Sequence, residues 1–182
     1  MKDLSLNLLD IAENSVKAGA TLTQLLLTQE GDILTFQVVD DGCGMTEEIL
    51  KGVVDPFYTT RTTRKVGLGL PLLRMAAEQT GGTMEVESRH VDAHPDNHGT
   101  TVTAVFHTDH IDCPPVGDMT ATVTTLIQGH PDTDFLFRHA DGETAVELDT
   151  RALREVLGEV SLAEYEVLQW ITGYLTDQYN GQ

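Results

Sequence analysis

The chain opens with one amphipathic helix followed by two adjacent strand-like segments, and this order restricts how it can fold. Apolar residues recur at intervals of three and four between residues 3 and 18, which predicts a helix that ends near Gly19. The apolar segments 22–29 and 34–40 flank Glu30-Gly31-Asp32, so they predict a hairpin. A helix with one apolar face needs a partner surface, and this hairpin supplies the start of a sheet.

Helices and strands continue through the first part of the chain. Thr46 is a suitable N-cap for a short helix. Residues 55–69 lack a hydrophobic period and are rich in Thr, Arg and Gly, so we interpret them as a loop and a candidate lid. Pro71 suits the first turn of a further helix, and segments 83–89 and 100–107 predict two strands. This pattern is typical of an α+β fold, a two-layer sandwich with helices on one face of a mostly antiparallel sheet.

A change in composition at Asp112-Cys113-Pro114-Pro115 indicates a linker. We therefore expect a first domain over residues 1–108 and a small mixed C-terminal extension over residues 109–182. Within the extension we expect a helix or strand at 119–128, a hairpin formed by 134–140 and 143–149, and helices near 151–157 and 161–176. In segment 119–128, β-branched threonines oppose the helix that Asp118 could cap.

Charge argues against one class of function and points to one class of ligand. The formal net charge of -18 argues against nucleic-acid binding, because contacts with phosphates need clustered Lys and Arg. Residues 108–182 hold 3 basic against 14 acidic residues, a net charge of -11. Several basic residues nevertheless lie close together in the sequence, between residues 51 and 74, and we expect a polyanionic ligand there. These residues are Lys51, Arg61, Arg64, Lys65 and Arg74.

Targeting and redox features are sparse. No apolar run approaches the ~20 residues that span a bilayer, and polar groups interrupt the first residues. We therefore expect no membrane segment and no signal peptide. Cys43 and Cys113 are too few for a disulfide framework, which favours a reducing, cytoplasmic location.

Short motifs carry the polar chemistry of the first domain. Asp10, Asn14 and Lys17 are spaced by four and three, so a carboxylate, an amide and an ammonium share one face of the first helix. A solvated helix face shows the same spacing, so this motif is weak evidence by itself. Asp40 ends an apolar strand and precedes Gly42 and Gly44, which allow the backbone to approach a ligand closely.

The remaining motifs lie in the loop, at the start of the next helix and at the last strand of the domain. They are Asp55-Pro56-Phe57-Tyr58-Thr59-Thr60-Arg61, Val66-Gly67-Leu68-Gly69-Leu70 and Gly99-Thr100-Thr101. Glycines before a helix N-terminus leave backbone amides available to phosphate. A lone Gly-x-Gly is weak evidence, whereas the whole set in this order is highly specific.

In this order and spacing, the motifs resemble the ATP-binding domain of the GHKL family, which joins DNA gyrase, the ninety-kilodalton heat-shock chaperones, histidine kinases and mismatch-repair ATPases. The resemblance covers about residues 3–107 and implies the two-layer sandwich of the Bergerat type. Residues 10–21 resemble the family's N motif, residues 40–44 and 67–70 its glycine motifs, and residues 56–60 its phenylalanine motif. The short lid is most similar to that of histidine kinases.

The resemblance implies that the chain binds ATP and Mg²⁺. Asn14 would coordinate Mg²⁺, and Lys17 would contact phosphate oxygens. Asp40 would accept a hydrogen bond from the adenine amino group, partly through water shared with Thr100 or Thr101, and so discriminate against guanine. The other residues that the resemblance assigns to nucleotide binding are Gly42, Gly44, Met45, Phe57, Thr60, Arg61, Arg64, Lys65, Gly67, Leu68, Gly69 and Leu70.

Two residues depart from the family's pattern. Asp10 is the candidate catalytic residue, because it stands where hydrolysing relatives carry a water-activating Glu. It is one methylene shorter, and a displacement near 1 Å can cost about 10²-fold in rate, so we expect slow or absent hydrolysis. Lys65 stands where kinases often have a glycine, which affects the geometry of the lid. With Arg61 and Arg64, Lys65 would close over the β- and γ-phosphates.

Two functions remain open. The first is a protein kinase or slow ATPase that acts in trans on a protein partner, since we expect no phosphoacceptor hairpin before the N motif. The alternative is a non-catalytic switch in which ATP orders the lid and changes the affinity for another protein. A structural adaptor with a dead pocket is disfavoured because Asn14, Lys17 and Asp40 are intact. The acidic extension would serve docking or regulation.

A His- and Asp-rich segment admits two interpretations. His90, Asp92, His94, Asp96 and His98 alternate with other residues, and such side chains are ligands of first-row metals. A solvated loop between two strands is the simpler interpretation. The cysteine of the first glycine motif is interpreted as a small buried residue and not as a redox switch.

Overall fold

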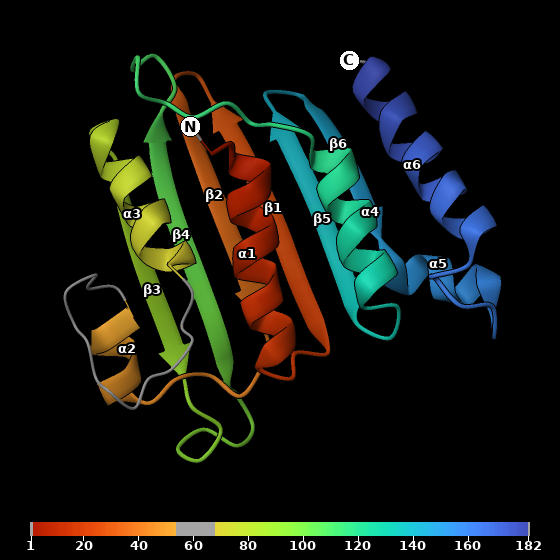
Figure 1. The fold of residues 1–182 in the computed structure, drawn as a ribbon, viewed down its shortest axis with the longest axis horizontal. Helices are drawn as coiled ribbons and strands as arrows, with labels where there is room; N and C mark the ends of the chain where they lie inside the picture. Colours follow the sequence, from red (N-terminus) through yellow and green to blue (C-terminus); the bar gives the residue numbers. More distant parts are fainter. Residues whose placement is uncertain (1, 54–67, 182) are drawn as a thin grey trace.

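The computed structural model describes residues 2–53 and 68–181. These residues fold into a six-stranded sheet with helices packed against it (Figure 1). The helices are α1 Leu4–Lys17, α2 Glu47–Val53, α3 Gly69–Gln79, α4 Met119–Gly129, α5 Thr150–Leu157 and α6 Tyr165–Asn180. The strands are β1 Leu22–Glu30, β2 Ile33–Asp40, β3 Thr83–Arg89, β4 Gly99–His107, β5 Asp134–Asp141 and β6 Thr144–Asp149. Segment 119–128, expected as a helix or a strand, is the helix α4.

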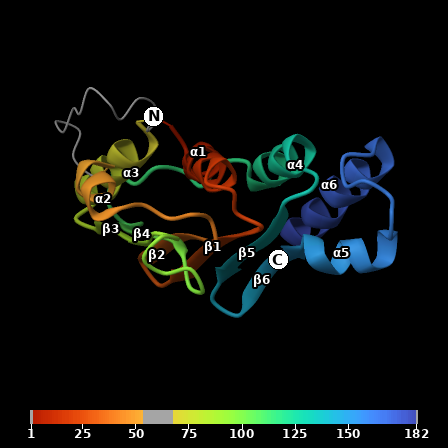
Figure 2. The same cartoon turned by 90° about the horizontal axis from the view of Figure 1, so that it is seen from below.

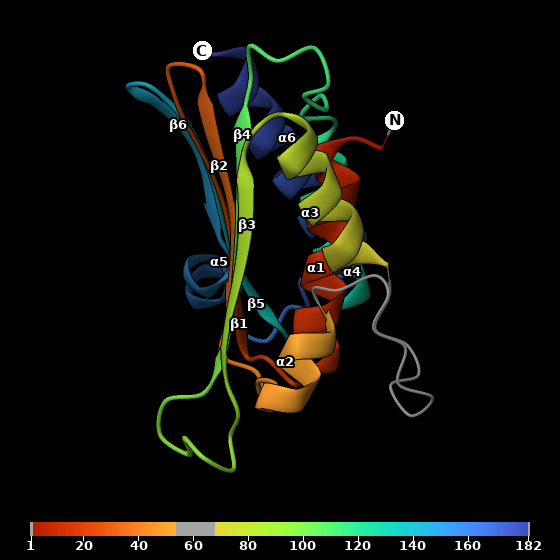
Figure 3. The same cartoon turned by 90° about the vertical axis from the view of Figure 1, so that its left-hand side faces the viewer.

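The sheet runs in the order β3-β4-β2-β1-β5-β6. Neighbouring strands are antiparallel except for β1 and β5, which are parallel. The helices α1, α3 and α4 lie on one face of the sheet (Figure 3). This arrangement confirms the α+β sandwich expected from the sequence.

Alternation along the strands explains why helices cover that face. Leu25 and Leu27 in β1 are fully buried, as is Phe36 in β2, while the residues between them are partly exposed. The helix α1 meets this surface with an apolar stripe formed by Leu4, Leu8, Ile11 and Ala12. Burial of each large apolar side chain contributes about 1.5–3 kcal/mol, so the layer between α1 and the sheet is a main source of stability.

The segment after residue 108 continues the same sheet and core. The strand β5 pairs with β1, and α4 packs beside α1 (Figure 1). The amides of Leu4 and Ser5 donate to the carbonyls of Pro115 and Val116, each at 2.9 Å. Apolar residues of the extension belong to one core cluster with those of α1 and β1. The composition change near Cys113 therefore does not divide the chain into two cores.

The helices α5 and α6 form the outer edge of the molecule (Figure 2). The helix α6 packs on α4 and β6 through Val167, Ile171 and Leu175. On the neighbouring face of α6, Trp170 and Tyr174 are exposed, at 52% and 41% of their surface. Within the described ranges, no helix combines the length and apolar character needed to cross a membrane.

Candidate functional site

A cavity of about 210 Å³ lies between α1 and the sheet. Its polar groups come from three elements that are distant in the sequence: Asn14, Ser15 and Lys17 from α1, Asp40 from β2 and Thr100 from β4. The apolar part of its wall is formed by Ile11, Met45, Ile49, Val53, Leu70 and Val102. A concave, mostly apolar site with a few convergent polar groups is the usual form of a small-molecule binding site.

Asp40 is the acidic group of this cavity, and two donors hold its carboxylate in place. The Ser15 hydroxyl donates to Oδ2 at 2.6 Å, and the Gly42 amide donates to Oδ1 at 2.9 Å. Ser15 is 3% exposed, so its hydrogen bond is made away from bulk water. A hydrogen bond to a charged group contributes about 1.5–3 kcal/mol. The fixed carboxylate has further lone pairs with which to accept a hydrogen bond from a ligand N–H.

The adjacent Asp41 has a structural role instead. Its carboxylate accepts hydrogen bonds from the amides of Thr21 at 2.7 Å and Leu22 at 3.0 Å, and from the Thr21 hydroxyl. Partial burial acts to raise the pKa of Asp41, but these hydrogen bonds outweigh it and lower that pKa. The two carboxylates therefore have different roles: Asp40 lines the cavity, and Asp41 fixes the start of β1.

A buried hydroxyl lies next to Asp40. Thr23 is directly opposite Asp40 in the ladder between β1 and β2, and it is fully buried. Among the described residues, no group forms a hydrogen bond with Thr23 Oγ1. Leaving such a hydroxyl unpaired costs about 1–3 kcal/mol. Thr23 does not line the cavity, so its hydroxyl is a polar group of the core beside Asp40.

The turn after β2 packs so closely that it requires glycine. Gly44 has a φ of 72°, and a Cβ there would lie 2.0 Å from the Arg89 carbonyl oxygen. The Met45 amide donates to Ser88 Oγ at 2.7 Å, and Ser88 Oγ lies 2.8 Å from Thr100 Oγ1. These contacts hold Gly44 and Met45 at the cavity wall against β3 and β4.

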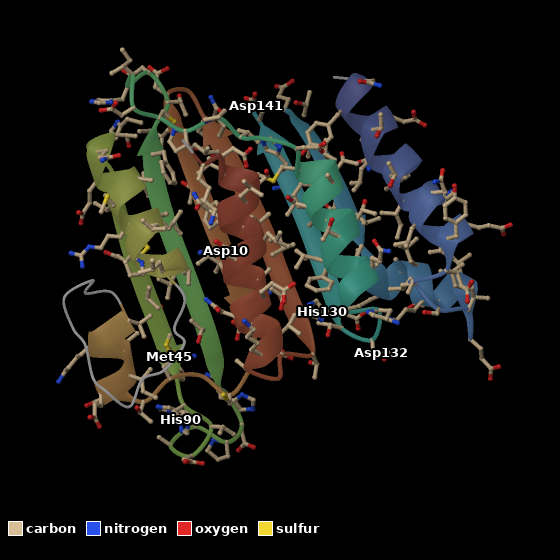
Figure 4. All side chains as sticks on the ribbon, in the orientation of Figure 1. Asp10, Met45, His90, His130, Asp132 and Asp141 are labelled. Atoms are coloured by element: carbon tan, nitrogen blue, oxygen red, sulfur yellow. The ribbon has the colours of Figure 1, made fainter. Side chains whose placement is uncertain are left out.

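The helix α3 begins next to Asp10 of α1. A Cβ on Gly69 would lie 3.4 Å from the Asp10 Cβ, so the two helices approach closely at this point. The N-cap residue of α3 is Leu68, whose side chain makes no hydrogen bond to the first turn. The backbone amides of a first helical turn favour an anion. Asp10 does not line the cavity; it lies on α1 and forms an ion pair with Lys2 (Figure 4).

The structure places only some of the site residues predicted from the sequence in the lining of the cavity. Seven of them line the cavity together: Asn14, Lys17, Asp40, Gly44, Met45, Leu70 and Thr100. Asp10, Gly42, Leu68 and Gly69 lie outside its lining, although Gly42 bonds to Asp40. Thr101 follows Thr100 in β4 and does not line the cavity, because successive side chains of a strand point to opposite faces. Outside the described residues lie Phe57, Thr60, Arg61, Arg64, Lys65 and Gly67.

Sequence reasoning did not identify Ser15 and Ser88 as site residues. By its spacing Ser15 belongs to the apolar stripe of α1, and its burial there is explained by the bond to Asp40. A lone serine in an apolar stripe, directly after Asn14, was the available signal. Ser88 gave no signal in the sequence, since its contacts with Met45 and Thr100 exist only once β3 and β4 pair.

The His- and Asp-rich segment forms no metal site in the described part of the chain. There, no group of three His, Cys, Asp or Glu side chains is close enough to hold a metal ion. His98 instead contacts the Gly42 carbonyl oxygen through Nδ1 at 2.5 Å, and His90 Nδ1 lies 3.5 Å from Asp92 Oδ2. The expectation that Cys43 is buried is wrong, because Cys43 is exposed in the turn after β2.

The sequence matches a known protein family. Residues 2–110 match the family described as "Histidine kinase-, DNA gyrase B-, and HSP90-like ATPase". Over 94 residues the chain is 30% identical to the sensor protein KdpD of Clostridium acetobutylicum. Over 88 residues it is 33% identical to sporulation kinase E of Bacillus subtilis.

These alignments are partial. They cover 49% and 48% of this chain, but only 10% of the Clostridium protein and 12% of the Bacillus protein. The chain therefore spans a small part of the length of these relatives. Among solved structures, the catalytic domain of the histidine kinase ThkA aligns at 19% identity with a TM-score of 0.39, covering 54% of this chain and 62% of that chain.

Proposed function

The chain belongs to the family of histidine kinase-, DNA gyrase B- and HSP90-like ATPases, and we propose that it binds ATP with Mg²⁺ in the cavity between α1 and the sheet. The observation that carries this proposal is the Asp40 carboxylate, held by Ser15 and Gly42 in the wall of a mostly apolar cavity. Such a group recognises a ligand N–H, and the apolar wall suits a flat aromatic ring.

The size of the cavity indicates which part of the nucleotide it holds. Its volume of about 210 Å³ is below the ~300–1,000 Å³ of pockets that enclose a drug-sized ligand. It therefore suits the base, with the phosphates extending from the α1 side of the cavity, where Asn14 and Lys17 lie. The adenine amino group would donate to Asp40, whereas guanine presents a carbonyl at that position. Loss of one hydrogen bond to a charged group, about 1.5–3 kcal/mol, predicts at least about tenfold weaker binding of GTP.

Asn14 and Lys17 fit the charged part of ATP. Both line the cavity on the α1 side, one helical turn apart. The amide oxygen of Asn14 is a suitable ligand for Mg²⁺, and the ammonium of Lys17 is a point charge for phosphate oxygens. When bound, Mg²⁺ would neutralise charge on the triphosphate. The first turn of α3, beside Asp10, offers backbone amides to the same anion.

Substitution of Asp40 tests the proposal. Asp40→Asn replaces one carboxylate oxygen by an amide donor at nearly constant volume, so the site would lose its negative charge and one of the two oxygens that can accept from the adenine amino group. Calorimetric titration with ATP and Mg²⁺ should show binding to the unaltered protein and a loss of at least about tenfold in the variant. Circular dichroism would check that the variant is folded. Unchanged affinity in a folded variant would contradict the assignment of the cavity.

We further propose that the protein is a kinase or slow ATPase that acts on a protein partner in trans, in the cytoplasm. Asp10 is the candidate catalytic group; its Cβ lies beside Gly69 at the start of α3, and its carboxylate forms an ion pair with Lys2. In support of a role in signalling, the relatives include a sensor protein and a sporulation kinase. The two cysteines are unpaired, which suits a reducing compartment.

Lengthening Asp10 distinguishes this function from the non-catalytic switch. Asp10→Glu restores the methylene that the carboxylate lacks, so a hydrolytic enzyme should release phosphate faster, by up to about 10²-fold. The measurement is release of labelled phosphate from γ-labelled ATP, with and without Mg²⁺. If neither the protein nor the variant releases or transfers phosphate while both bind ATP, the switch is the correct function.

A further inference from the structure

An apolar groove of about 530 Å³ separates α5 from α6. It lies at the end of the molecule farthest from α2 and α3 (Figure 2). Its apolar wall is formed by Leu153, Val156, Leu157, Val160, Val167 and Trp170. The groove and the nucleotide cavity have no lining residue in common.

Large apolar side chains are exposed along this groove. Val156 is 85% exposed, Val160 50% and Trp170 52%. The Trp170 ring stacks on Tyr174, with centroids 4.8 Å apart, which forms a rigid aromatic surface. Contiguous exposed apolar residues with a central Trp are typical of protein interfaces.

The free charges around the groove are acidic. Glu166 lines it, and Glu159 directly precedes Val160 of the lining. Both glutamates are exposed, and no ion pair joins them to another described residue.

The two arginines of α5 do not offset this charge. Arg151 pairs with Asp149 at 2.9 Å, and Arg154 pairs with Asp134 at 2.7 Å. Arg154 also donates to the carbonyl oxygens of Pro131 and Thr133. Both guanidinium groups are therefore already compensated, and the groove presents an apolar floor with a negative rim.

We propose that this groove docks an amphipathic helix of another protein, with apolar residues on one face and Lys or Arg on its flanks. A helix seats its apolar face in such a groove, and flanking positive charges would meet the acidic rim. A second copy of this chain is the less suitable occupant. Its net charge is -18, and a two-fold contact would place one acidic rim against another. The proposal does not rest on nucleotide binding.

Trp170 allows a direct test, because it is the only tryptophan in the chain. The probe is a Trp-free synthetic helix with Leu at alternating three- and four-residue intervals and Lys on both flanks. Its acidic twin carries Glu in place of every Lys. Titration with the basic peptide should shift the Trp170 emission to shorter wavelength, whereas the acidic twin should leave it unchanged. Binding should weaken as salt screens the charges.

Matched variants assign the binding to the groove. Val156→Asp, and separately Glu166→Lys combined with Glu159→Lys, should each weaken binding of the basic peptide by about tenfold or more. The control for the first is Ile111→Asp, since Ile111 is 94% exposed and outside the groove. The control for the second is Glu30→Lys, at the end of β1, combined with Glu143→Lys, in the turn between β5 and β6, which makes the same change of charge.

Three outcomes would overturn the proposal. The first is equal binding of the basic and acidic peptides, and the second is an equal loss of binding in the control variants. The third is dimerisation in sedimentation equilibrium that Val156→Asp abolishes, which would assign the groove to a second copy. ATP titration of the same variants should be unchanged, so failure of this proposal is separable from failure of nucleotide binding.

Discussion

Replacement of Phe137 by alanine should destabilise the two parts of the chain together. Phe137 lies in β5 within the extension and is fully buried. Its register partner across the parallel ladder is Leu25 of β1, which is also fully buried. The aromatic ring therefore fills space that both parts of the chain enclose.

The magnitude depends on the size of the side chain. Truncation of a buried Phe to Ala costs about 3–5 kcal/mol, through lost burial and the cavity left behind. The whole domain is stable by about 5–15 kcal/mol, so this is a large fraction of the total. For a chain of this size, 1 kcal/mol corresponds to about 2–4 °C, which predicts a fall in Tm of about 6–20 °C.

Urea unfolding with two probes measures the effect. Trp170 fluorescence follows α6 in the extension, and far-UV circular dichroism follows the whole chain. With one shared core, both probes should report a single transition that Phe137→Ala moves to lower urea. Ile111→Ala is the control, because Ile111 is 94% exposed and its loss should change stability by at most about 0.5 kcal/mol.

Separate transitions would refute this reasoning. If Trp170 reports an early transition that Phe137→Ala shifts, while the dichroism of the remaining structure is unaffected, residues 109–182 form a core of their own. A boundary near residue 108 would then be correct, and truncation there would leave a folded protein. A common transition instead predicts that such truncation exposes Leu25 and Leu27 and unfolds the chain.

Further predictions concern the cavity and the effect of pH. Ser15→Ala should weaken ATP about tenfold in calorimetry without unfolding the protein, because Asp40 loses a buried donor. Asn14→Ala should weaken ATP only with Mg²⁺ present; an equal loss in chelator would exclude its metal role. Burial lowers the pKa of His139 despite the nearby Asp141, so the unfolded state binds the proton more readily. Unfolding free energy from urea titrations should therefore fall as pH drops below about 6.5, and less steeply in His139→Gln.

Local signals were sufficient to predict the first helix, the hairpin and the turn that holds Asp40. The helix has a regular apolar stripe and an N-cap, in which Asp3 Oδ1 accepts from the Leu6 amide at 3.0 Å. The glycine motif was recognisable because close packing imposes glycine at Gly44, where a Cβ would meet the Arg89 carbonyl. The polar residues of α1 and the acid at the end of β2 then meet in one cavity, as their motifs suggested.

Non-local contacts account for what the sequence did not reveal. In α4, threonines disfavour a helix, yet Asp118 caps it and Val123, Leu126 and Ile127 are fully buried. Tertiary packing thus outweighs local propensity here. The parallel pairing of β1 with β5 joins segments more than one hundred residues apart, and no local pattern encodes it.

Mapping ATP onto the protein by NMR shows whether the nucleotide binds between α1 and the sheet. In ¹H–¹⁵N spectra, addition of ATP and Mg²⁺ should shift the amide signals of Gly44, Leu70 and Thr100, which line the cavity. The indole N–H of Trp170, in the groove at the far end of the molecule, should not move. Shifts confined to the α5–α6 end, with Gly44 and Thr100 unchanged, would contradict nucleotide binding between α1 and the sheet.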